Sequence, residues 1–488
     1  MKKKSIAKNY IYNLIHQVLI IFLPLVTTPY LSRVLGVEAI GIYGYTVSIV
    51  TYFILFGTLG ISMYGQREIA YLQDDKKKIS KTFWEIILLR LVTLSISIFL
   101  FFIIYGRSGE YALYYRILLI HLVANIFDIS WLFQGIEEFD KTVIRNVVIK
   151  FLCLILVFVW VKTPNDLWKY FTIYALSEFV GNISIWGYVP KYLDKVSLKD
   201  LNLKRHIKPT LALFLPQIAV QIYTVLDKTM IGAITNDMSE VGYYEQAQKI
   251  VKSALLILGA LQIVMNSRIA NAYAKNDTEE IKNCLKKSFC FFWLIGIPMM
   301  FGLISVASKF VPWYYGVEFE SVISIIITLA PILLIIGFSG ITGNQYLVQV
   351  GKHKIYTCSV VIGAIINLVL NTILIHYFNS VGACIASLIA EVTILSIQLY
   401  YFREQFKVKE ILKLSIKNWV SGIVMFVVLI FVVDRLEVSV FNTLLEVLIG
   451  SSIYFVCLLL LKDKFFKDLC SQVLFSIKNV LFLKKVTK

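Results

Sequence analysis

Three ionisable side chains share one face of an otherwise apolar stretch. Residues 241–259 read VGYYEQAQKIVKSALLILG and contain Glu245, Lys249 and Lys252 at spacings of four and three. Positions i, i+4 and i+7 lie on the same side of an α-helix. At 1.5 Å per residue, Lys252 would lie about 16 Å along the helix, near the middle of a membrane. A charge there costs about 2.5–3.5 kcal/mol and needs an interior partner or a cavity.

This face therefore predicts a cationic wall that binds an anionic substrate. The competing interpretation is that Glu245 pairs with Lys249 and that both side chains extend outward along the helix. Lys252 is too deep to do so easily, so we assign Lys252, Lys249 and Glu245 to the predicted substrate-binding set.

Further charges lie in other apolar stretches. Asp227 and Lys228 close the segment FLPQIAVQIYTVLDK, and Arg33 lies near the end of the similar segment FLPLVTTPYLSRVLG. These three complete the predicted substrate-binding set.

Two carboxylates, Glu178 and Asp128, are candidates for coupling to an ion. A lone carboxylate within a spanning helix needs a partner or a coupling ion. Arg90 lies within two turns of the inner end of its stretch, and we expect its side chain to extend towards that end.

Each FLP segment places a proline inside an apolar run. Pro24 and Pro216 each remove a backbone donor and disturb the preceding helical turn. We predict that they act as matched hinges, and a static kink is the alternative.

The elements that carry these residues must lie in lipid. The chain has 488 residues, of which 58% are hydrophobic and 16% charged, and its mean hydropathy is +0.74. Soluble domains are about 45–50% apolar and about 25% charged. A segment in lipid must satisfy its own backbone hydrogen bonds. No segment of the sequence alternates apolar and polar residues as a strand of a membrane barrel does, so all spans are predicted to be α-helices.

The apolar runs predict about fourteen transmembrane helices in an all-α polytopic membrane protein. Their ranges are 10–33, 40–65, 83–105, 111–134, 143–162, 167–189, 208–232, 241–265, 288–308, 320–345, 356–378, 381–402, 417–434 and 443–461. The first run follows a basic start and imitates a signal peptide, but it is too long and lacks a cleavage site.

The charges predict the orientation. With both termini inside, 36 Lys and Arg fall in or beside inner segments, 6 in outer connections and 6 within spans. Cytoplasmic loops carry such an excess, so we predict that both termini are cytoplasmic. The net charge of +17 then needs no nucleic-acid partner.

The two FLP segments predict a repeat. Each is followed by a related stretch, EAIGIY at 38–43 and EVGYY at 240–244. We predict two six-helix lobes related by pseudo-two-fold symmetry, plus two C-terminal helices. The predicted parts are an N-terminal lobe at 1–190, a basic cytoplasmic linker at 191–207, a C-terminal lobe at 208–402, extra helices at 403–461 and a basic amphipathic tail at 462–488.

Enzyme signatures are missing from the sequence. It contains no GxxxxGK[ST], HExxH or GxSxG motif, and its seven cysteines form no CxxC pair. We predict no catalytic residue, no metal site and no bound cofactor, with coupling to a sodium or proton gradient left open. The chain is expected to move a substrate across the membrane rather than to make bonds.

Several motifs resemble one family. They are PYLSRVLGVEAIGIY (29–43), YGQREIA (64–70), WLFQGIEEFDKTVIRN (131–146), LDKTMIG (226–232) and EVGYYEQAQKI (240–250). They resemble the Gram-positive branch of the Wzx-type polysaccharide flippases, which belong to the multidrug/oligosaccharidyl-lipid/polysaccharide (MOP) exporter superfamily. One departure is VMNSRI at 264–269, where relatives tend to have a proline before the arginine.

The resemblance implies a bacterial plasma-membrane flippase that moves undecaprenyl-pyrophosphate-linked oligosaccharide from the inner to the outer leaflet by alternating access. Capsule, teichoic acid or exopolysaccharide would be built from it. The implied partners are this lipid-linked substrate, membrane lipids and polysaccharide synthesis enzymes.

Three alternatives stay open. A multidrug cation antiporter of the same superfamily would need carboxylates rather than lysines to dominate its cavity. A polysaccharide polymerase would need longer outer loops than the predicted connections of about a dozen residues. A scaffold role for the basic inner loops is compatible with any of these.

Overall fold

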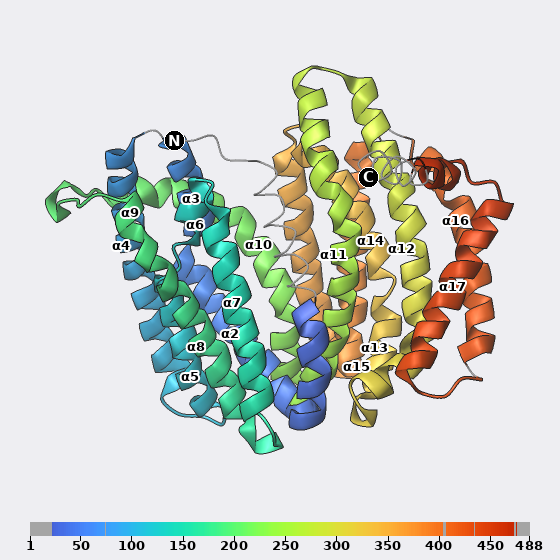
Figure 1. Cartoon of the computed structure of the whole chain (residues 1–488), viewed down its shortest axis with the longest axis horizontal. Coiled ribbons are helices and arrows are strands. Elements are labelled where there is room, and N and C mark those ends of the chain that lie inside the picture. Colours follow the sequence, from blue (N-terminus) through green and yellow to red (C-terminus); the bar gives the residue numbers. More distant parts are fainter. Residues whose placement is uncertain (1–21, 74, 404–406, 434, 473–474, 476–488) are drawn as a thin grey trace, which may run out of the picture. The chain divides into compact units, whose positions relative to one another are not determined.

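The computed structural model describes residues 22–73, 75–403, 407–433, 435–472 and 475, and within these ranges the ordered elements are helices (Figure 1). The chain divides into two compact units, residues 1–245 and 246–488. The first predicted helix lies partly outside the described residues, which cover its helical part from 22 to 35.

The described part of the chain contains nine helices that are long and apolar enough to cross a membrane. They are Val37–Tyr71, Lys76–Gly106, Ala112–Gly135, Phe139–Trp160, Thr278–Tyr314, Ser321–Val348, His353–Phe402, Val408–Val433 and Val440–Leu460. A multi-pass all-α membrane fold is therefore confirmed. The remaining predicted spans coincide with helical residues 22–35 and with α8 (Leu167–Ser184), α10 (Lys204–Thr235) and α11 (Met238–Ala274).

Unit 1 is built from long helices that run side by side. They are α2 (Val37–Thr58), α4 (Lys76–Phe101), α5 (Ala112–Ile126), α7 (Phe139–Trp160), α8 and α10, and the short helices α3 (Ile61–Tyr71), α6 (Ser130–Gly135) and α9 (Val189–Tyr192) lie at one end (Figure 1). One apolar core surrounds Trp131 and Phe83 near these short helices. A second core, around Leu118 and Phe171, joins α2, α5 and α8. These cores fix the rotation of each helix and hence the direction of its polar residues.

The first two helices of each predicted repeat are separated by similar turns. The helix formed by residues 22–35 is followed by Gly36, where φ is +82°, and α2 then begins at Val37. In the second repeat α10 ends at Asn236, where φ is +54°. Glycine and asparagine tolerate this left-handed region better than other residues. The two turns agree with the predicted repeat, although lobe symmetry itself stays a prediction.

Two glycines let α2 and the start of α11 approach closely. A Cβ atom on Gly41 would lie 1.6 Å from the carbonyl oxygen of Met238. A Cβ atom on Gly242 would lie 2.4 Å from the carbonyl oxygen of Val37. Any larger residue would force the two backbones apart, because neither obstacle is a movable side chain. The glycines therefore permit this helix crossing, and both belong to the EAIGIY and EVGYY stretches.

Unit 2 contains α12 (Thr278–Tyr314), α13 (Ser321–Leu329), α14 (Ile332–Ser339), α15 (His353–Phe402), α16 (Val408–Val433) and α17 (Val440–Leu460). The long helix α15 covers two predicted spans. It breaks at Asn379, where φ is +49° and ψ is −133°. This break lies between the predicted spans 356–378 and 381–402, so α15 consists of two helices that meet at Asn379.

The last helices of unit 2 form a small bundle. Leu294 of α12, Met425 of α16 and Tyr454 of α17 share one buried cluster. Residues 464–472 of the predicted amphipathic tail are helical, and Phe466 and Leu469 pack against this cluster. The predicted tail after residue 472, apart from residue 475, lies outside the described residues.

The division into packed units differs from the predicted division into lobes. The boundary between the units falls after Glu245, inside α11, and not at the 191–207 linker. Helix α10 packs on α2 and α3, which explains why it groups with unit 1. The predicted lobes at 1–190 and 208–402 stay a prediction.

Candidate functional site

Two members of the predicted substrate-binding set form a buried ion pair. The Lys228 ammonium lies 2.9 Å from the Glu245 carboxylate, and their side chains are 12% and 11% exposed. They are 17 residues apart, but the turn after α10 places α10 and α11 antiparallel, so the two residues face each other. The competing interpretation of the sequence paired Glu245 with Lys249 on the same helix; the structure adds a partner from the neighbouring helix, Lys228.

A second pair joins the same two helices. The Tyr244 hydroxyl donates a hydrogen bond to the Asp227 carboxylate, and both residues are buried. Asp227 is therefore held by a neutral phenol. Neighbouring positions on each helix thus carry one ion pair and one hydrogen bond, which fix the hairpin in register.

A cluster of three tyrosines lies near the Glu245 carboxylate. Tyr43 comes from α2, and its ring centroid lies 4.8 Å from that of Tyr170 and 5.6 Å from that of Tyr174, both in α8. Glu245 lies close enough to interact electrostatically with all three phenols. A Cβ atom on Gly44 would meet its carboxylate at 3.6 Å. We call Tyr43, Tyr170 and Tyr174 the tyrosine cluster.

The tyrosine cluster has the composition of a saccharide site. Its side chains are half-buried rather than sealed in the core. Aromatic rings present apolar faces and a polar hydroxyl tip, and sugar rings likewise combine apolar C–H faces with hydroxyl groups. Sequence analysis missed these tyrosines because tyrosines are frequent in this chain, which has 28 of them.

Lys249 and Lys252 lie further along α11, in unit 2. The Lys252 ammonium donates a hydrogen bond to the Gln248 side-chain oxygen at 2.9 Å, and Lys252 is exposed. Lys249 is half-buried. Arg33, at the end of helical residues 22–35, is also exposed. The structure leaves the substrate-binding role of these three cations as a prediction.

Asp128, one predicted ion-coupling residue, stabilises a break in the predicted span 111–134, and its ion coupling stays a prediction. This span is broken between α5 and α6, and the Asp128 carboxylate accepts hydrogen bonds from the Ser130 amide at 3.0 Å and the Ser130 hydroxyl at 2.5 Å. Arg90 pairs with the same carboxylate at 3.4 Å and donates to the Asp128 carbonyl at 3.1 Å. Arg90 is only 1% exposed. The expectation that it extends towards the membrane surface is therefore wrong, because the helix break supplies its partners.

Other side chains satisfy the remaining carbonyl groups at this break. Asn182 donates to the Ala124 carbonyl at 2.9 Å, and the Trp186 indole donates to the Phe127 carbonyl at 2.8 Å. A broken helix is tolerated inside a membrane only where such partners exist. Side chains from other helices therefore stabilise the break.

The second predicted coupling residue, Glu178, lies on an exposed face of α8. It interacts electrostatically with Arg145 and Lys150 of α7. Ion coupling by Glu178 stays a prediction. The hinge role of the two prolines also stays a prediction. Pro24 is an exposed residue of the helix at 22–35, and the backbone of Pro216 is helical within α10.

A buried polar network that the sequence did not predict lies at the end of unit 1 that carries the short helices. Glu85 of α4 is fully buried and accepts hydrogen bonds from the Asn202 amide and from Arg205 Nε, each at 2.8 Å. His206 Nε2 lies 2.8 Å from the same carboxylate, while His206 Nδ1 lies 2.7 Å from the Tyr64 hydroxyl. The network ties the 198–206 segment to α3 and α4.

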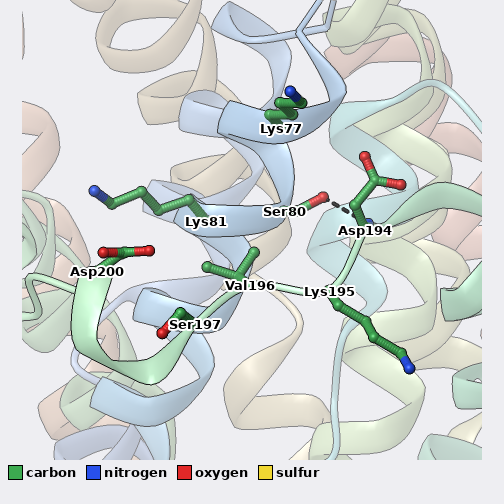
Figure 2. Close-up of a pocket in the computed structure, with 8 residues that line it drawn as sticks. All are labelled: Lys77, Ser80, Lys81, Asp194, Lys195, Val196, Ser197 and Asp200. Atoms are coloured by element: carbon green, nitrogen blue, oxygen red, sulfur yellow. Dashed lines mark hydrogen bonds between the residues drawn. The ribbon is translucent and has the colours of Figure 1, made fainter.

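The preceding residues 194–200 and α4 form a surface cavity of about 540 Å³ (Figure 2). The lining residues are Lys77, Ser80, Lys81, Asp194, Lys195, Val196, Ser197 and Asp200. Figure 2 shows the Asp194 amide bonded to the Ser80 hydroxyl, a contact of 2.8 Å. None of the predicted substrate-binding residues lines this cavity, so it is separate from the candidate site.

The comparisons with protein families match most of the chain. A family described as "Polysaccharide biosynthesis protein" matches residues 6–264, and the MatE family matches residues 212–373. A putative O-antigen transporter of Escherichia coli K12 is 26% identical over 406 residues, which cover 82% of this chain and 97% of the relative. A probable low-salt glycan biosynthesis flippase of Haloferax volcanii is 27% identical over 165 residues, or 34% of each chain.

Solved structures share the fold. The inward closed conformation of the lipid II flippase MurJ superposes with a TM-score of 0.74 at 18% identity, covering 95% of this chain and all of that one. An inward-facing multidrug resistance MATE family transporter of the MOP superfamily gives a TM-score of 0.64 at 17% identity, with 85% and 96% covered. The Gram-positive branch stays a prediction. The polysaccharide biosynthesis protein family matches residues 6–264, which is more than half of the 488 residues of this chain, so the chain belongs to that family.

Proposed function

We propose that the protein is a flippase that moves a lipid-linked oligosaccharide across the plasma membrane. The observation that carries the proposal is the Lys228–Glu245 ion pair beside the tyrosine cluster, in helices that coincide with predicted spans. The relatives include a putative O-antigen transporter and a probable glycan biosynthesis flippase, and a structural neighbour is a lipid II flippase.

The substrate has two chemistries, a sugar part and a phosphate part. In unit 1 the tyrosine cluster stacks on sugar rings, while Glu245 accepts hydrogen bonds from sugar hydroxyl groups. In unit 2 the cations Lys249 and Lys252 attract phosphate groups, because cations on a membrane helix recognise anions where water is scarce. The carrier is an undecaprenyl pyrophosphate, movement is by alternating access, and Arg33 contributes a further cation.

The orientation follows from the charges. The end of unit 1 that carries α3, α6, α9 and the basic 191–207 segment faces the cytoplasm, as do both termini. The turn between α10 and α11 then faces outward. Polysaccharide synthesis enzymes supply the substrate on the inner side and consume it on the outer side.

A multidrug cation antiporter is the second candidate, and it is favoured by the MatE match at residues 212–373. Organic cations require carboxylates that are available to them. Here Glu245 is paired with Lys228 and Asp128 with Arg90. Binding an organic cation at either carboxylate would require breaking a buried ion pair, so the flippase is the better supported function.

The test is a flipping assay in reconstituted vesicles with a defined fluorescent lipid-linked oligosaccharide. We expect Lys252→Ala to slow flipping about tenfold, since a charge-assisted contact is worth about 1.5 kcal/mol. The control is Lys275→Ala, an exposed lysine at the end of α11, which should flip at the normal rate.

The two parts of the proposal fail differently. Unimpaired flipping by Lys252→Ala would remove Lys252 from the site but leave the function intact. Wild-type vesicles that exchange organic cations and move no lipid-linked oligosaccharide would instead favour the antiporter.

A further inference from the structure

One buried carboxylate in the C-terminal bundle has no hydrogen-bond partner. Glu446 of α17 is 0% exposed, and both of its carboxylate oxygens lack a partner among the described residues. It lies six residues after the start of α17, about 9 Å into the helix. An ionised carboxylate in such a place would be strongly destabilising, because burial without a partner favours the neutral form.

The helices that pack on α17 supply one counter-charge. Trp313 of α12 donates a hydrogen bond to the Thr443 hydroxyl at 2.7 Å, so this face of α12 meets the face of α17 that carries Glu446. Lys309 lies one helical turn before Trp313 and interacts electrostatically with Glu446. The two side chains form no ion pair in the described structure, as neither Glu446 oxygen has a partner.

Among the described residues of α12, α16 and α17, Lys309 is the charged side chain that interacts with Glu446. Residues 418–433 of α16 contain no charged residue, and Glu446 is the sole charged residue of α17. Arg435 and Glu437, in the connection before α17, are exposed. The ionisation of Glu446 therefore depends on its burial and on the charge of Lys309.

We propose that Glu446 is a proton-binding site in the α12–α16–α17 bundle, neutral in this conformation and able to release its proton as Lys309 closes onto it. On release the carboxyl O–H bond breaks and the proton passes to water at the nearby start of α17. The resulting carboxylate is balanced by the Lys309 ammonium in an ion pair. The packing of α17 on α12 thereby depends on pH.

A proton fits this site better than a metal cation. Cations such as sodium or calcium need several oxygen ligands, and the described residues contain no group of three or more His, Cys, Asp and Glu side chains that could hold a metal. A carboxyl group needs no further ligand to bind a proton. The inference does not depend on the proposed transport function.

The test uses the full-length protein in lipid bilayers and infrared spectra recorded over a pH titration. We expect a protonated-carboxyl band at neutral pH that is lost in Glu446→Gln, an isosteric change that should keep the fold. The matched control is Glu437→Gln, an exposed residue at the same end of α17, which should keep the band. The wild-type band should disappear on raising the pH.

A second variant tests the role of Lys309. Lys309→Met should raise the pH midpoint of the Glu446 band by about one unit or more, because a nearby cation favours the ionised carboxylate. If Glu446→Gln leaves the neutral-pH band unchanged, Glu446 is already ionised and the proposal is overturned. An unshifted midpoint in Lys309→Met would overturn the assignment of Lys309 as its partner.

Discussion

Replacing Glu85 by alanine should detach the 198–206 segment from unit 1. The fully buried carboxylate binds the Asn202 amide and Arg205, and it lies 2.8 Å from His206. The neutral imidazole suits this arrangement, because Nε2–H can donate to Glu85 while Nδ1 accepts from the Tyr64 hydroxyl. Alanine would leave all these donors without their acceptor.

The magnitude follows from the exposure of each partner. Breaking a buried ion pair by removing one partner costs about 3–5 kcal/mol. Arg205 is 47% exposed and can turn to water, whereas His206 is only 2% exposed. We therefore expect a cost near the lower limit, about 3 kcal/mol. Glu85→Gln should cost about 1 kcal/mol, the difference between charge-assisted and neutral hydrogen bonds.

Thermal unfolding of the purified protein, followed by a probe in unit 1, measures this effect. A loss of about 3 kcal/mol should lower Tm by about 6–12 °C for a unit of this size. Limited proteolysis should also cut the 198–206 segment sooner. The control is Glu279→Ala, which removes an exposed ion pair with Lys282 at 3.2 Å and should change Tm little. If Glu85→Ala unfolds at the same temperature as this control, the buried network contributes no net stability.

Two other predictions concern the helix crossing and the orientation. Gly41→Ala should prevent α2 from crossing α11, because the new methyl group would overlap the Met238 carbonyl oxygen; we expect a loss of several kcal/mol, and an unchanged unfolding temperature would contradict the crossing. In a cysteine-free background, an impermeant thiol reagent added to intact cells should label Ser239→Cys and should label Ser197→Cys only after permeabilisation. The reverse pattern would overturn the proposed orientation.

Sequence analysis predicted the helices well for a physical reason. A helix in lipid satisfies its own backbone, so about 20 apolar residues suffice to indicate one. The break of α15 at Asn379 falls between two predicted spans. The predicted span 111–134 is likewise found, as Ala112–Gly135. Its break at Asp128 was not predicted, because it lies inside an apolar run and depends on Arg90, Asn182 and Trp186 from other helices.

The candidate site was predicted in part. Glu245 and Lys228 were identified because intramembrane charges are rare and costly. Helical spacing describes only one helix at a time, so it offered Lys249 as an alternative partner of Glu245 and could not indicate the contact with Lys228. The tyrosine cluster and Glu85 were missed because tyrosine is abundant and a glutamate near a helix end usually faces water.

By itself the sequence determined the class of this protein. Its apolar content requires lipid, its basic segments indicate an orientation, and its motifs carry the family resemblance; all of these are local or additive properties. Tertiary structure alone decided which side chains meet. Tyr43 and Tyr170 are 127 residues apart, and Glu85 and Arg205 are 120 apart. No local pattern sets how far each helix is rotated, because that rotation comes from the packing of the apolar cores.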